Sequence, residues 1–175
     1  MEALFAKLSR FWWMVAAGSA LVVAGLVYLA LPSHAGRILP PPRARVYTSF
    51  DACLLTDTDG VSGSAAAPVW AGMQAASLKT SGKVSFLAVA GPDTVANAIP
   101  YLNTLVQRRC DLVLAVGAAE VGAVEAQARA FGSARFAVVG GPAGPNVSTV
   151  SHGSATQESA AVQDLVTRAA AEVKN

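Results

Sequence analysis

The chain has 175 residues, of which 53% are hydrophobic and only 14% are charged, and its formal net charge is +2. This length accommodates one ordinary domain with an appendage and excludes two full domains. The basic residues form no stripe, so the composition does not indicate a nucleic-acid-binding protein. Much of the apolar excess over a typical soluble domain lies near the N-terminus.

Residues 11–31 (FWWMVAAGSALVVAGLVYLAL) contain no charged, Asn or Gln side chain. At about 1.5 Å per residue, a helix of this length spans about 30 Å, the thickness of the hydrocarbon core of a bilayer. Aromatic rings lie near both ends, where lipid headgroups would contact them. We therefore predict a transmembrane anchor in contact with membrane lipid over 11–31, preceded by a cytoplasmic flank over 1–10.

The alternative for the same segment is a cleaved signal peptide, because Ser33 and Ala35 are small residues of the kind that a signal peptidase reads. The apolar run is longer than a typical signal-peptide core of about 7 to 15 residues, which favours the anchor. Residues 32–46 then carry four prolines, three of them consecutive, and this predicts a stiff extended stalk. The remaining residues, 47–175, are expected to form one domain.

Within 47–175, short apolar runs alternate with longer Ala-rich stretches, the pattern of repeated strand and helix units. The strands are nearly continuous in apolar residues, as in parallel sheets that are covered on both faces. We predict a single doubly wound α/β domain with a mostly parallel sheet and right-handed crossovers. Strands are expected at 52–56, 84–90, 112–116, 136–139 and 147–150, and helices at 65–78, 94–108, 119–131 and 155–173.

Acidic residues and glycines follow the predicted strands, at the sheet edge where open α/β folds bind ligands. Glycine allows close backbone approach to a ligand, and a carboxylate accepts hydrogen bonds from hydroxyl or amine groups. The alternative is structural, with glycines in tight turns and acids at helix N-termini. The candidate ligand-binding residues are Asp57, Asp59, Gly60, Gly91, Gly117 and Glu120.

Motifs for catalysis or cofactor binding are not found in the sequence. Asp57, Asp59 and Glu120 would suit a hard metal cation, but no spacing in the sequence fixes the three together. The chain has no phosphate-binding glycine loop with its Lys and no full dinucleotide fingerprint. The serines at 62 and 64 are not in a nucleophile elbow. We therefore predict no enzymatic activity, no metal and no cofactor.

The two cysteines, Cys53 and Cys110, lie at the starts of the first and third predicted strands. If the sheet is ordered 2-1-3, these strands are parallel neighbours and a disulfide between the cysteines is geometrically reasonable. Such a bond fits an oxidising compartment and would place the domain outside the cell. The alternative is two buried free thiols that behave as small apolar residues.

Several segments, in the same order, resemble the basic membrane protein family of ABC-transporter substrate-binding proteins. Residues 52–61 (ACLLTDTDGV) and 69–73 (VWAGM) resemble that family's first strand, acidic glycine loop and Trp-containing helix. Residues 111–117 (DLVLAVG) and 135–141 (RFAVVGG) resemble its third and fourth strands, and residues 145–147 the turn into the next strand. The resemblance implies one lobe of a type 1 periplasmic-binding fold.

The resemblance further implies an extracytoplasmic domain that captures a small solute, often a nucleoside, with Asp57 as a hydroxyl-binding residue. Implied partners are ABC-transporter membrane subunits, or a second lobe from a partner or another copy. The family's usual Ser-Phe-Asn unit is replaced here by residues 64–68 (SAAAP), which lack the aromatic ring that could stack on a base. The alternative function is therefore a ligand-free interaction or scaffold domain that kept the fold.

Overall fold

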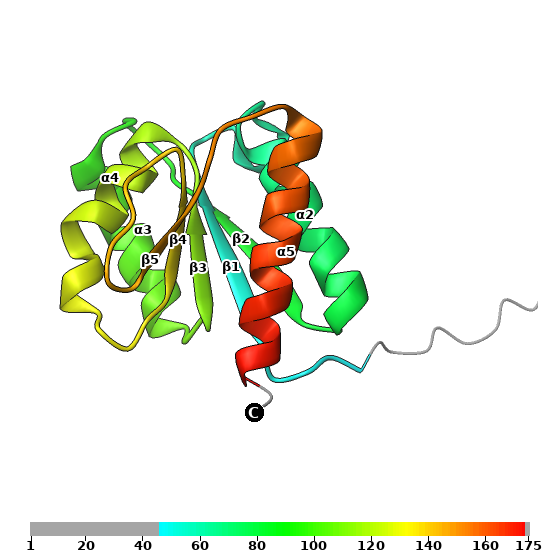
Figure 1. Ribbon diagram of the computed structural model, residues 1–175. Coiled ribbons are helices and arrows are strands. Elements are labelled where there is room, and N and C mark those ends of the chain that lie inside the picture. The colour runs from blue at the N-terminus through cyan, green and yellow to red at the C-terminus, as the bar shows by residue number, and fades with distance from the viewer. Residues whose placement is uncertain (1–45, 174–175) are drawn as a thin grey trace, which may run out of the picture. The chain divides into compact units, whose positions relative to one another are not determined.

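The computed structural model describes residues 46–173 of the chain (Figure 1). The predicted anchor over 11–31 lies outside these residues, as does the predicted stalk apart from its last residue. Among the helices of the described part, none is long and apolar enough to cross a membrane.

The described residues alternate strands and helices as the sequence pattern predicts. Strands β4 and β5 and helix α5 have the predicted limits, and each of the other predicted elements differs from its prediction by one to four residues at one end or at both. The elements are β1 (Asp51–Thr56), η1 (Gly60–Ser62), α2 (Ala66–Thr80), β2 (Lys83–Ala88), α3 (Val95–Gln107), β3 (Leu112–Ala115), α4 (Ala118–Gln127), η2 (Ala128–Ala130), β4 (Phe136–Val139), β5 (Val147–Val150) and α5 (Ala155–Val173).

The five strands form one sheet in the order β2-β1-β3-β4-β5, and every neighbouring pair is parallel. Helices α2 and α5 cover one face of this sheet, and α3 and α4 cover the other (Figure 1). The doubly wound α/β class with a parallel sheet is therefore confirmed. Strands β3 and β4 are buried along their whole length, while the edge strands β2 and β5 are partly exposed.

Side chains of the central strands alternate between the two cores, as the two-residue period of a strand requires. Leu54 and Leu114 pack in the core beneath α2 and α5. Leu55, which follows Leu54 in β1, and Val113, which precedes Leu114 in β3, pack in the core beneath α3 and α4. The sheet is thus anchored by apolar burial on both faces, which leaves its carboxyl edge as the place for polar chemistry.

Helices α2 and α5 approach each other closely at Gly72. A Cβ atom at this position would collide with the backbone oxygen of Ser159 and lie 2.9 Å from Cβ of Val162. Glycine is therefore needed here to let the two helices pack, not to make a turn.

Candidate functional site

The candidate site lies between the carboxyl ends of β1 and β3. From β1 the chain passes to α2 on one face of the sheet, and from β3 it passes to α4 on the other face. The two connections diverge at this topological switch point, which is the place where open α/β sheets bind their ligands and which we call the crevice. The structure places Asp57 directly after β1, and Gly117 and Glu120 directly after β3.

The loop after β1 is organised around Asp57. The backbone N–H of Asp59 donates to Asp57 Oδ1 at 3.0 Å, and the N–H of Gly60 donates to the backbone oxygen of Asp57 at 3.1 Å. Gly60 adopts φ +61°, a left-handed conformation that favours glycine, and it is buried. Asp57 is partly buried, whereas Asp59 is exposed.

Glu120 is the exceptional residue of the site. It lies in the first turn of α4 and is 1% exposed, yet neither of its carboxylate oxygens has a hydrogen-bond partner in the described part of the chain. Its Oε2 occupies the space next to Gly117, where a Cβ atom would collide with it, and Gly117 has φ +112°. Gly117 therefore both begins α4 and makes room for the carboxylate.

A helix-capping role does not satisfy Glu120. An acidic residue in the first turn is favoured by the partial positive charge of the helix N-terminus, and in a capping box it accepts a hydrogen bond from the N-cap amide. No such hydrogen bond is formed here. A buried polar group without a partner costs about 1 to 3 kcal/mol, and more when it is charged, so its retention calls for an explanation.

The surroundings of Glu120 favour its protonated form. Burial raises the pKa of its carboxyl above the ordinary value, and the negative charges of Asp93 and Asp57 raise it further. The backbone N–H of Glu120 itself lowers the pKa, although it is not aligned for a hydrogen bond to either oxygen. The site therefore contains the carboxyl groups of Asp57, Asp93 and Glu120, and only that of Glu120 is fully buried.

Asp93 was not among the residues that the sequence indicated, although it follows the second strand just as Asp57 follows the first. Its proximity to Glu120 depends on the packing of α3 against α4, which the sequence does not reveal. The predicted Gly91 has a structural role: with φ +98° it turns the chain beside Asn97, whose Nδ2 donates to the backbone oxygens of Ala90 (2.8 Å) and Pro92 (3.0 Å).

The acidic residues do not form a metal centre. Among residues 46–173, no group of three or more His, Cys, Asp or Glu side chains is placed to hold a metal ion. Neither ion pair of the described residues, Arg135 with Glu172 or His152 with Glu158, neutralises these acidic residues.

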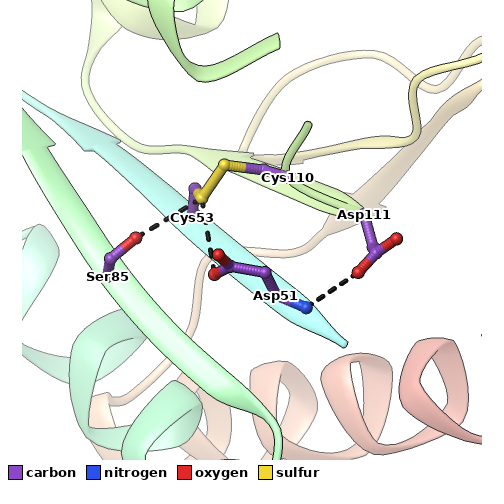
Figure 2. The surroundings of a disulfide bond; sticks show 5 residues. All are labelled: Asp51, Cys53, Ser85, Cys110 and Asp111. Carbon is purple, nitrogen blue, oxygen red and sulfur yellow. Dashed lines mark hydrogen bonds between the residues drawn. A yellow bond between two sulfur atoms is a disulfide. The ribbon is translucent and has the colours of Figure 1, made fainter. Parts of the chain in front are cut away.

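Cys53 and Cys110 are joined by a disulfide in the structure, with their Cα atoms 5.9 Å apart (Figure 2). The bond links β1 to the segment just before β3, and both residues are buried. Ser85 Oγ donates to Cys53 Sγ at 3.4 Å. Asp51 Oδ1 lies 3.8 Å from the same sulfur, but a disulfide sulfur has no proton to donate, so this is a contact only.

Two surface hollows lie away from this site. One of about 420 Å³ is lined by Arg135, Asn146 and Glu172 at the amino ends of β4 and β5, and one of about 550 Å³ runs beside β5 and His152. In the first, Arg135 is paired with Glu172, and the other charged residue of the lining, Arg168, is exposed to solvent, so neither is a buried group without a partner. We therefore place the candidate site at the carboxyl edge, where the buried and unpartnered Glu120 lies.

No protein-family model and no curated protein matches the chain. A solved structure similar in fold is that of a fragment from Peptoclostridium difficile 630 that is provisionally named a lipoprotein. The two share 17% sequence identity with a TM-score of 0.54, and the similarity covers 69% of this chain and 98% of the other. At this identity the similarity shows the α/β fold alone.

The raised pKa of Glu120 makes a prediction about stability. Because the folded state binds this proton more readily than the unfolded state, the contribution of Glu120 is most favourable at low pH and is lost as the pH rises through the raised pKa. Glu120→Gln should therefore be more stable than wild type at neutral pH, by about 1 kcal/mol. Urea unfolding of both proteins between about pH 4 and pH 8 measures this.

The advantage of Glu120→Gln over wild type should grow with pH. Burial also raises the pKa of Asp51, but that residue is present in both proteins and cancels in the difference. A difference that does not change with pH would mean that Glu120 ionises in the folded chain as it does in the unfolded one.

Proposed function

We propose that residues 47–175 form an extracytoplasmic solute-binding module, held at the membrane by the segment over 11–31, that binds its ligand at the crevice between β1 and β3. The observation that carries the proposal is Glu120, a buried carboxylate without a partner at the switch point of the sheet. Keeping it buried costs stability, and a ligand that supplies its missing partner would recover that cost.

Two further observations support a location outside the cytoplasm. The Cys53–Cys110 disulfide is of a kind that persists in oxidising compartments and is rare in the cytosol. The fragment with a similar fold is provisionally named a lipoprotein, which accords with a domain held at a membrane surface. The described residues supply a single lobe, so a second lobe, from a partner or another copy, would be needed to enclose a ligand fully.

A thermal-shift screen of the full chain, in a mild detergent, tests the proposal. Nucleosides, sugars, amino acids and small amines are added at millimolar concentration, and a ligand at 100 times its dissociation constant should stabilise the fold by about 2.7 kcal/mol. The stabilisation should be lost in Glu120→Gln and kept in Glu125→Gln, which changes an exposed glutamate on the same helix. If no compound stabilises the wild type, the ligand-free scaffold becomes the better account.

A further inference from the structure

We infer that the solute bound at this crevice carries an organic cationic group, a primary amine or ammonium, that pairs with Glu120. The inference rests on the proposed function and narrows it to a class of ligand. Its basis is the buried carboxyl group of Glu120, which has no hydrogen-bond partner, together with the negative charges of Asp93 and Asp57 that act on it.

The charges around the crevice are all of one sign. The charged groups that act on Glu120 are Asp93, before α3, and Asp57, after β1, and both are acidic. The ion pairs of the described residues leave all three carboxylates uncompensated. An anionic group would be repelled here, whereas a cationic group compensates the charge that Glu120 bears once it ionises.

An organic cation fits these residues better than a metal ion does. Among residues 46–173, no three His, Cys, Asp or Glu side chains are placed to hold a metal ion. An ammonium group has three N–H donors, so one donor can reach Glu120 while the others face the remaining carboxylates or water. A ligand with two amines could also contact Asp57 and Glu120 from different ends.

Two neighbouring residues, Asp57 and Gly117, bear on such contacts. Asp57 Oδ1 accepts a hydrogen bond from the backbone N–H of Asp59. The structure records no hydrogen bond from the described residues to Asp57 Oδ2. Gly117 presents no side chain beside Glu120, but both carboxylate oxygens are buried, so the Glu120 side chain must change rotamer to meet a ligand.

The test is a titration of the full chain with 1,4-diaminobutane, and with 1,4-butanediol as a neutral molecule of the same length. The amine should bind and raise the melting temperature, and the diol should not. Glu120→Gln should weaken amine binding about 10- to 100-fold. Asp93→Asn should weaken it by a smaller factor, and Glu125→Gln should leave it unchanged.

The pH dependence gives a second measurement. Because Glu120 must lose its proton to pair with the amine, the affinity should rise as the pH rises through the raised pKa of Glu120, and Glu120→Gln should remove this rise. A structural role for Glu120 would not produce a pH-dependent affinity.

The outcomes separate this inference from the function on which it rests. If neutral solutes bind in a Glu120-dependent manner and amines do not, the inference of a cationic ligand is wrong, and the proposal of a solute-binding module is retained. Stabilisation by Mg²⁺ or Ca²⁺ that Glu120→Gln abolishes, without any response to the amine, would also overturn it. If neither amines nor neutral solutes bind, both proposals fail.

Discussion

Removal of the Cys53–Cys110 disulfide is expected to lower the free energy of unfolding by about 4 kcal/mol. The two cysteines are 57 residues apart in sequence, and the bond closes this segment into a loop in the unfolded chain. Opening the loop restores conformational entropy to the unfolded state, and the loop length sets the magnitude. The Cys53→Ala/Cys110→Ala variant should therefore melt about 10 to 20 °C below the wild type.

Chemical denaturation of the double variant and of the reduced wild type measures the effect. The free energies of unfolding of the two proteins should agree because both lack the bond, even though only the variant also lacks the sulfur atoms. Wild type purified with free thiols from the extracytoplasmic side of the membrane would contradict the disulfide and remove the main support for the proposed location.

Gly72→Val is expected to be the next most damaging change, with a loss of about 2 kcal/mol. The new side chain would collide with the backbone oxygen of Ser159 and crowd Val162, so α2 and α5 would have to move apart. Overpacking of this kind costs about 1 to 3 kcal/mol, and the better helix propensity of valine over glycine recovers only a few tenths.

The matched control for Gly72→Val is Ala71→Val, because Ala71 is the exposed neighbour on the same helix. It should cost about 0.6 kcal/mol or less, the difference in helix propensity alone. Urea unfolding of both variants makes the comparison. Equal losses would mean that the α2–α5 contact is looser than the structure places it.

Most of the fold could be predicted because the spacing of apolar residues in the sequence indicates which segments are buried strands and helices. The runs at 136–139 and 147–150 and the periodic segment 155–173 have the predicted limits. Strand β2 ends at Ala88, two residues before its prediction at 90, because its partner β1 ends at Thr56, which pairs with Ala88. The apolar run continues through Val89, but a strand ends where its hydrogen-bonded neighbour turns away.

The candidate site was only partly predictable, for a physical reason. The sequence indicates that acids follow the strands, and this is how Asp57 and Glu120 were found. It does not indicate that Glu120 is buried without a partner, or that Asp93 lies near it, because both depend on how α4 packs against α3 and the sheet. Asp59 and Gly91 have the same signal in sequence, and the structure places Asp59 in an exposed loop and Gly91 in a turn with φ +98°.

The most direct test of the account is the ionisation of Glu120, followed through its side-chain carboxyl ¹³C resonance in a pH titration of the full chain. Without ligand, the account predicts a pKa above the ordinary value for glutamate, and 1,4-diaminobutane should lower that pKa because the amine pairs with the charged form. An ordinary pKa that no added amine or neutral solute changes would contradict the account.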